Sequence, residues 1–152
     1  SHSWYAGATY TFFSAPWAPD LTYRYSAFSK NYDSLLYGYG GDLGTWVQGE
    51  IVGNSMLFNT NQRTSMIKFG LHPSEALTAG IAYYDFSFYG KPEGVSHSEF
   101  AKDTNLFIDW VPNNNVAVGA VMGMGKPGEG AKEYLGSNST SYLFETYFIY
   151  SF

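Results

Sequence analysis

The last twelve residues of the chain, SYLFETYFIYSF at positions 141–152, decide the fold class because their side chains alternate strictly in character. Five of the six even positions are aromatic, whereas the odd positions mix serine, leucine, glutamate, tyrosine and isoleucine. Successive side chains of a β-strand point to opposite faces of the sheet. The segment is therefore predicted to be a strand with one aromatic face and one mixed face.

The same alternation recurs along the chain, while helical periodicity is nearly absent. It predicts six earlier strands, within residues 4–12, 21–28, 66–71, 77–84, 105–110 and 116–125. Each is about as long as the ~9–11-residue strand that crosses a bilayer at a tilt. The chain is therefore predicted to be all-β, with seven strands.

The connections between these strands come in two kinds that alternate along the chain. Three are short and rich in turn-forming residues, at 14–20, 72–75 and 111–115, and three are long, at roughly 29–53, 90–103 and 126–140. Outer-membrane barrels have short periplasmic turns and longer extracellular loops. A soluble sandwich or barrel has no reason to sort its loop lengths by end, so this pattern favours a membrane barrel.

The composition excludes several classes of protein. The chain is 45% hydrophobic, 20% aromatic and only 14% charged, with a formal net charge of -5 and no cysteine, whereas an ordinary soluble domain is about 25% charged. So many aromatic residues argue against disorder, and the lack of a basic stripe argues against nucleic acid as a partner. No apolar run approaches the ~18 residues of a transmembrane helix, and the N-terminus lacks the features of a signal peptide. A soluble all-β domain and a membrane β-barrel remain.

The predicted inward face distinguishes these two classes. It carries small residues beside four charged ones, Arg24, Lys68, Asp109 and Glu145, whereas a small soluble barrel fills its interior with large apolar side chains. An Arg or Lys on the lipid face would be destabilising by about 2–4 kcal/mol at the bilayer midplane. We therefore predict an antiparallel transmembrane barrel of the porin type in the bacterial outer membrane. The four charges are expected to line its lumen, where they either pair across strands or bias which solutes pass.

The strand count is odd, whereas bacterial single-chain barrels have even numbers of strands with both ends in the periplasm. Either an eighth strand is hidden within residues 45–54, or the chain is the C-terminal part of a larger barrel. We favour the second interpretation, in which preceding strands or another chain complete the barrel.

Several segments resemble those of a known family of membrane proteins. They are YSAF (25–28) followed by YDSLLYG (32–38), GTWVQGEIVG (44–53), NTN (59–61), HPSE (72–75), AYYDF (82–86) and YSF (150–152). Over roughly residues 20–152 the chain is similar to the alginate-export family of outer-membrane β-barrels, with Ser34 where proline is usual. The resemblance implies a wide barrel of about eighteen strands, within the range of bacterial barrels, that exports an anionic polysaccharide through a basic lumen.

The predicted inward face departs from that family. A constricted path for anions needs a ring or ladder of Arg or Lys, but here Arg24 and Lys68 are offset by Asp109 and Glu145. We therefore predict a general channel for passive export or diffusion of polysaccharide or small polar solutes.

The C-terminal strand and one loop supply further candidates. A C-terminal aromatic strand ending in phenylalanine is the general mark by which the bacterial barrel-assembly machinery recognises its substrates, which assigns that role to Phe148, Tyr150 and Phe152. Four loop aromatics are candidates for stacking on sugars: Tyr32, Tyr37, Tyr39 and Trp46.

No group of residues points to catalysis, to a cofactor or to a metal ion. The three histidines, His2, His72 and His97, are scattered and lack metal-ligand spacing with carboxylates. An outer-membrane enzyme would need an acid–base constellation at the extracellular rim, where only His97, Glu93 and Glu99 gather. We therefore predict that the protein is not an enzyme. The alternative to a channel is a small closed barrel that acts as a binding or structural module through its loops.

Overall fold

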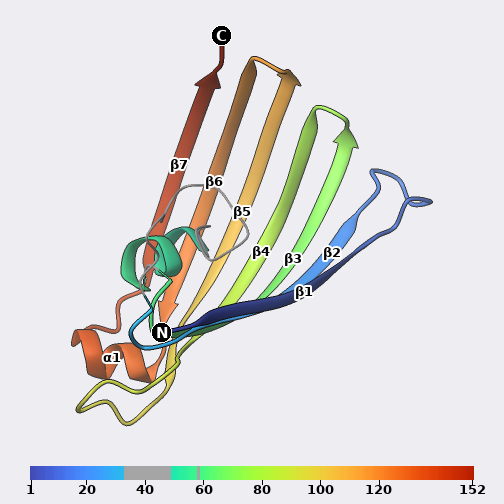
Figure 1. Ribbon diagram of the computed structural model, residues 1–152. Helices are drawn as coiled ribbons and strands as arrows, with labels where there is room; N and C mark the ends of the chain where they lie inside the picture. Colours follow the sequence, from blue (N-terminus) through green and yellow to red (C-terminus); the bar gives the residue numbers. More distant parts are fainter. Residues whose placement is uncertain (33–48, 58) are drawn as a thin grey trace.

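The computed structural model is an all-β structure built on one antiparallel sheet (Figure 1). It describes residues 1–32, 49–57 and 59–152. The strands are β1 (Ser3–Thr11), β2 (Asp20–Phe28), β3 (Gln62–Ser74), β4 (Leu77–Phe88), β5 (Glu99–Asn113), β6 (Val116–Pro127) and β7 (Ser141–Tyr150), and each pairs with the next in sequence order. Two helical segments lie in the connections, the π-helix η1 (Gly49–Leu57) and the α-helix α1 (Glu129–Leu135). The prediction of an all-β antiparallel fold is confirmed.

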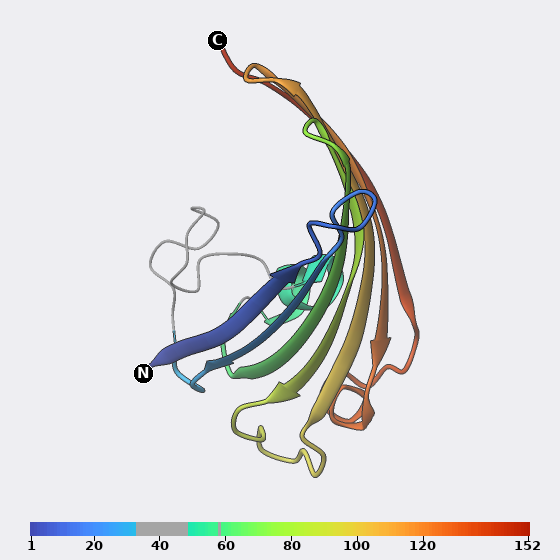
Figure 2. The ribbon, with the colours of Figure 1, turned by 90° about the vertical axis from the view of Figure 1, so that its right-hand side faces the viewer.

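The sheet is curved and open. Figure 2 shows a concave face, on which η1 lies, and a convex face on the other side. Among the described residues no pairing joins β1 to β7, so the sheet has two free edges. Neither η1 nor α1 is long and apolar enough to cross a membrane.

The connections are sorted between the two ends of the sheet. The short turns after β1, β3 and β5 lie at one end together with the C-terminus, and the long connections and α1 lie at the other (Figure 1). We call these the short-turn end and the loop end.

The strands extend further than alternation alone predicted. At the loop end, β5 begins at Glu99, inside the predicted loop 90–103, and β6 runs to Pro127, inside the predicted loop 126–140. At the short-turn end, β3 and β5 reach Ser74 and Asn113, which shortens the predicted turns 72–75 and 111–115. Both extensions follow register irregularities, between Leu71 and Ser74 and between Trp110 and Asn113. A bulge inserts an extra residue and breaks the period of two, so alternation cannot reveal the strand beyond it.

The alternative of an eighth strand within residues 45–54 is wrong in the described part of that range, because residues 49–57 form η1. Gly49 has a φ of +74°, in the left-handed region that glycine adopts without steric cost. From Gly49 onward, η1 packs against the concave face. The connection between β2 and β3 therefore spans residues 29–61 rather than 29–53.

The buried core lies at the loop end, between η1, α1 and the concave face. It comprises Ile51, Val52, Leu57, Phe86, Phe88, Val95, Phe100, Ala101 and Ala131. Because burial of apolar surface is the main favourable contribution to folding, this cluster holds η1 and the loops onto the sheet.

Candidate functional site

The convex face carries a continuous apolar row across the middle of the strands, while charged residues such as Arg63, Asp85 and Lys102 lie on it nearer the loop end. One row of cross-strand neighbours runs through all seven strands, and its members are Tyr10, Leu21, Phe69, Ile81, Leu106, Met122 and Phe144. Each of these side chains is between 40% and 68% exposed. Soluble monomers rarely expose contiguous apolar patches larger than a few hundred Å². This face is therefore built for an apolar environment or an apolar partner.

The concave face is polar, and it carries all four charged residues predicted from alternation. In the register, Arg24 is opposite Gly7, Lys68 is opposite Ala82, and Asp109 and Glu145 are opposite Gly119 and Val121. Since cross-strand partners share a face, Arg24, Lys68, Asp109 and Glu145 lie together on the side that η1 occupies.

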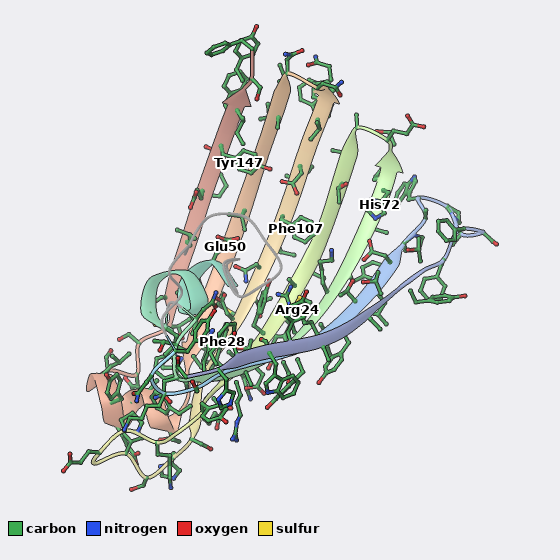
Figure 3. All side chains as sticks on the ribbon, viewed as in Figure 1. Arg24, Phe28, Glu50, His72, Phe107 and Tyr147 are labelled. Carbon is green, nitrogen blue, oxygen red and sulfur yellow. The ribbon has the colours of Figure 1, made fainter. Side chains whose placement is uncertain are left out.

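Three of these four residues surround one hollow on the concave face. Its volume is about 430 Å³, and its charged lining residues are Glu50, Lys68, Asp109 and Glu145. Tyr84, Asn105, Phe107 and Tyr147 line it as well. Figure 3 shows Glu50, Phe107 and Tyr147 on the same side of the sheet. Arg24 does not line this hollow. It is opposite Met66 in the register, and Met66 lies nearer the loop end of β3 than Lys68 does.

Asp103 fixes η1 against the sheet. Its side chain is fully buried, and one carboxylate oxygen, Oδ2, accepts hydrogen bonds from the backbone N–H groups of Ile51 at 3.0 Å and Val52 at 2.9 Å. The Asn105 amide donates to the other oxygen of Asp103 at 3.2 Å, and its own oxygen accepts the Glu50 N–H at 3.4 Å. A buried carboxylate is tolerated when it is hydrogen-bonded in this way.

Close packing against the neighbouring strand also fixes η1. Ile51 lies over Gly125 of β6, where an added Cβ would come within 2.9 Å of the isoleucine side chain. The small residue therefore makes room for η1 to approach the sheet. Together, the hydrogen bonds and this contact hold Glu50 in front of β5 and β6.

The carboxyl group of Glu50 has a raised pKa. The largest cause is burial against the sheet, and the negative charges of Glu145 and Asp103 add to it. Both causes disfavour the charged form of a carboxyl group. Glu50 itself lines the hollow, so it lies on the part of η1 that faces it.

Other polar groups on the concave face bond to one another. The Tyr147 hydroxyl donates to Asp109 at 2.5 Å. Nearer the short-turn end, His72 Nε2 lies 2.7 Å from Asp20, and His72 Nδ1 lies 3.3 Å from the Thr78 hydroxyl. Each of these bonds joins side chains of two different strands, so together they stabilise the arrangement of the strands in the sheet.

The alternation on its own missed three carboxylates on this face: Asp20, Glu50 and Asp103. Asp103 is in phase with Asp109, and Asp20 is in phase with Arg24, so an even spacing could have found both had the strands been drawn to their full length. Glu50 gives no such signal, because its position follows from the packing of η1.

The predicted loop aromatics fall mostly outside the described residues, as Tyr37, Tyr39 and Trp46 do. Tyr32 is described and half-buried, and its ring packs on Phe28 with centroids 5.3 Å apart. Its carbonyl oxygen accepts a hydrogen bond from the Thr60 hydroxyl at 2.7 Å. These contacts give Tyr32 a structural role in the loop.

The C-terminal aromatics are exposed. Phe148 and Tyr150 are opposite Val118 and Val116 of β6, on the convex face, and both are exposed. Phe152 lies beyond the end of β7 and is also exposed.

The three histidines lie apart. His72 bonds to Asp20, His97 lies 2.8 Å from Glu133, and His2 lies 3.1 Å from the Tyr89 hydroxyl. In the part of the chain that the structure describes, no three His, Asp or Glu side chains are grouped to hold a metal ion.

The chain was compared with models of protein families, with curated proteins and with solved structures, and none of the three comparisons finds a match.

Proposed function

We propose that this chain forms part of an outer-membrane β-barrel that acts as a passive channel for polar solutes. The observation that carries the proposal is the contrast between the two faces of the sheet. An apolar row crosses all seven strands on the convex face, while charged and amide side chains line a hollow on the concave face. Transmembrane barrels alternate apolar residues toward lipid with polar residues toward a wet lumen.

The free edges of β1 and β7 support completion by further strands. An edge strand presents unpaired N–H and C=O groups, and each such group left in hydrocarbon costs several kcal/mol. A sheet that lies in a bilayer must therefore close. Strands from elsewhere in the polypeptide or from another chain would complete the barrel, with lipid against the convex face.

The C-terminal strand suits recognition by the barrel-assembly machinery. Phe148, Tyr150 and Phe152 are exposed at the short-turn end, which is the periplasmic end in a barrel with long extracellular loops. The loop end, with α1, would then face the outside of the cell.

Planar-bilayer recordings on the intact protein that contains this chain test the channel. We expect stepwise increases in conductance as single molecules insert, because a water-filled lumen passes ions. Insertion verified by protease protection but accompanied by no conductance would contradict the proposal.

The apolar core at the loop end favours a second candidate, a closed barrel that binds a partner through its loops. There η1 and α1 pack with Phe88 and Phe100. Such packing would seal the loop end of a closed barrel. The same recordings separate the two functions, since a sealed barrel inserts without conducting.

A further inference from the structure

The charges around the hollow are unbalanced. Among the described residues, three carboxylates, those of Glu50, Asp109 and Glu145, line it beside one cation, Lys68. We propose that the channel prefers cations to anions, and that Glu50 on η1, facing Glu145 of β7, sets this preference. The inference rests on the proposed channel function and names its substrate class: small cations and uncharged polar molecules rather than anionic polysaccharides.

Hydrogen bonds to the sheet fix the backbone of Glu50 beside the hollow. The backbone N–H of Glu50 donates to Asn105, and the next two N–H groups donate to the buried Asp103. Ile51 and Val52 are buried in the core beneath. A carboxylate on so restrained a backbone keeps its place in the hollow, whereas one on a free loop would spend most of its time in bulk solvent.

Two carboxylates of the sheet add to the negative charge of Glu50 at the hollow. Glu145 faces the hollow from β7, and its field contributes to the raised pKa of Glu50. Asp109 lies on the same face of β5 as Asn105, nearer the short-turn end. Its carboxylate accepts a hydrogen bond from the Tyr147 hydroxyl. Carboxylates at a constriction attract cations and repel anions.

The remaining charges of the concave face do not reverse this balance. Arg24 adds one cation, but Asp103 and Asp20 add two carboxylates on the same face. Among the described residues, the concave face and η1 together carry two cations and five carboxylates. The basic residues of the convex face, such as Arg63 and Lys102, point away from the hollow.

Reversal potentials in a KCl gradient across a planar bilayer test the inference. The current through the intact protein is expected to reverse at a potential closer to the K⁺ than to the Cl⁻ equilibrium potential. Glu50→Gln and Glu145→Gln should each shift the reversal potential toward zero, because each removes a negative charge. Lys68→Gln removes a positive charge and should shift the reversal potential further toward the K⁺ equilibrium potential. Asp85→Asn is the matched control, because it removes a carboxylate from the exposed convex side of β4 and should leave the reversal potential unchanged.

Conductance with no preference or with anion preference would overturn this inference and leave the channel standing. Equal reversal potentials in the wild type, Glu50→Gln and Glu145→Gln would also overturn it, because the preference would then come from elsewhere. Verified insertion without conductance would overturn the channel and the inference together.

Discussion

Asp103 is the single residue on which the position of η1 most depends. Replacing it by alanine leaves the N–H groups of Ile51 and Val52 and the amide of Asn105 without their acceptor. A buried donor without an acceptor costs about 1–3 kcal/mol. We expect Asp103→Ala to release η1, with faster hydrogen exchange at the amides of Ile51 and Val52.

Asp85→Ala is the control for this experiment, since Asp85 is an exposed carboxylate on the neighbouring strand. It should leave exchange at Ile51 and Val52 unchanged. If these two amides exchange as slowly in Asp103→Ala as in the wild type, the core alone holds η1 and the role given to Asp103 is wrong.

At this scale the sequence predicts residues that a strand period places and misses residues that tertiary packing places. Lys68, Asp109 and Glu145 follow directly from alternation, because each lies in the part of its strand that was predicted. Asp103 was hidden because it was counted in a loop. Glu50 reaches the hollow only because a helical segment folds back onto the sheet, and no local period of the sequence encodes that contact.

The elements at the loop end are tied together by Glu133 of α1. Its carboxylate accepts from the His97 ring at 2.8 Å and from the backbone N–H groups of His97 and Ser96 at 3.1 and 2.7 Å. These bonds lower the pKa of Glu133, with the bond to the His97 side chain the largest cause. A carboxyl with a lowered pKa stabilises the folded state above the unfolded value of about 4.3. We expect this stabilisation to be lost as the pH falls through the lowered folded pKa.

Glu133→Gln should remove this pH dependence and lower the hydrogen-exchange protection factors of Ser96 and His97 at neutral pH. Glu129→Gln, on the same helix, is the control, because Glu129 pairs only with the exposed Lys132 among the contacts described. Protection that is the same in Glu133→Gln as in the wild type would show that the loop is held by its apolar contacts instead.

Among the elements, strands were predictable and the two short helices were not. Seven strands show the period of two, and their ends were missed where bulges interrupt it. The sequence around α1 does hold one signal, Gly136, which ends the helix with a φ of +69°. Glycine in this conformation is a common C-terminal cap. Gly49, with a φ of +74°, stands at the start of η1, but no periodicity in the sequence indicates the rest of the segment, which is hydrogen-bonded to Asp103 of β5.

At the scale of the whole molecule, both the sorting of the connections and the contrast between faces were visible in the sequence. The sequence did not reveal whether the sheet closes, because closure depends on strands that pair with β1 and β7. Figure 2 shows the curvature of the sheet, which the proposed wider barrel would need. In that barrel, lipid would cover the apolar row of the convex face.

Face assignment is the prediction on which the membrane interpretation depends. Phe144 and Met122 are opposite each other on the convex face, and Glu145 and Val121 are opposite each other on the concave face. A one-residue slip would exchange these faces and place a carboxylate in hydrocarbon, which is costly. Spin labels at 144 and 122 in lipid should therefore be relaxed by oxygen, and those at 145 and 121 by a water-soluble nickel complex. Equal access of the nickel complex to all four positions would mean a soluble two-sided sheet, and the membrane assignment would then fail.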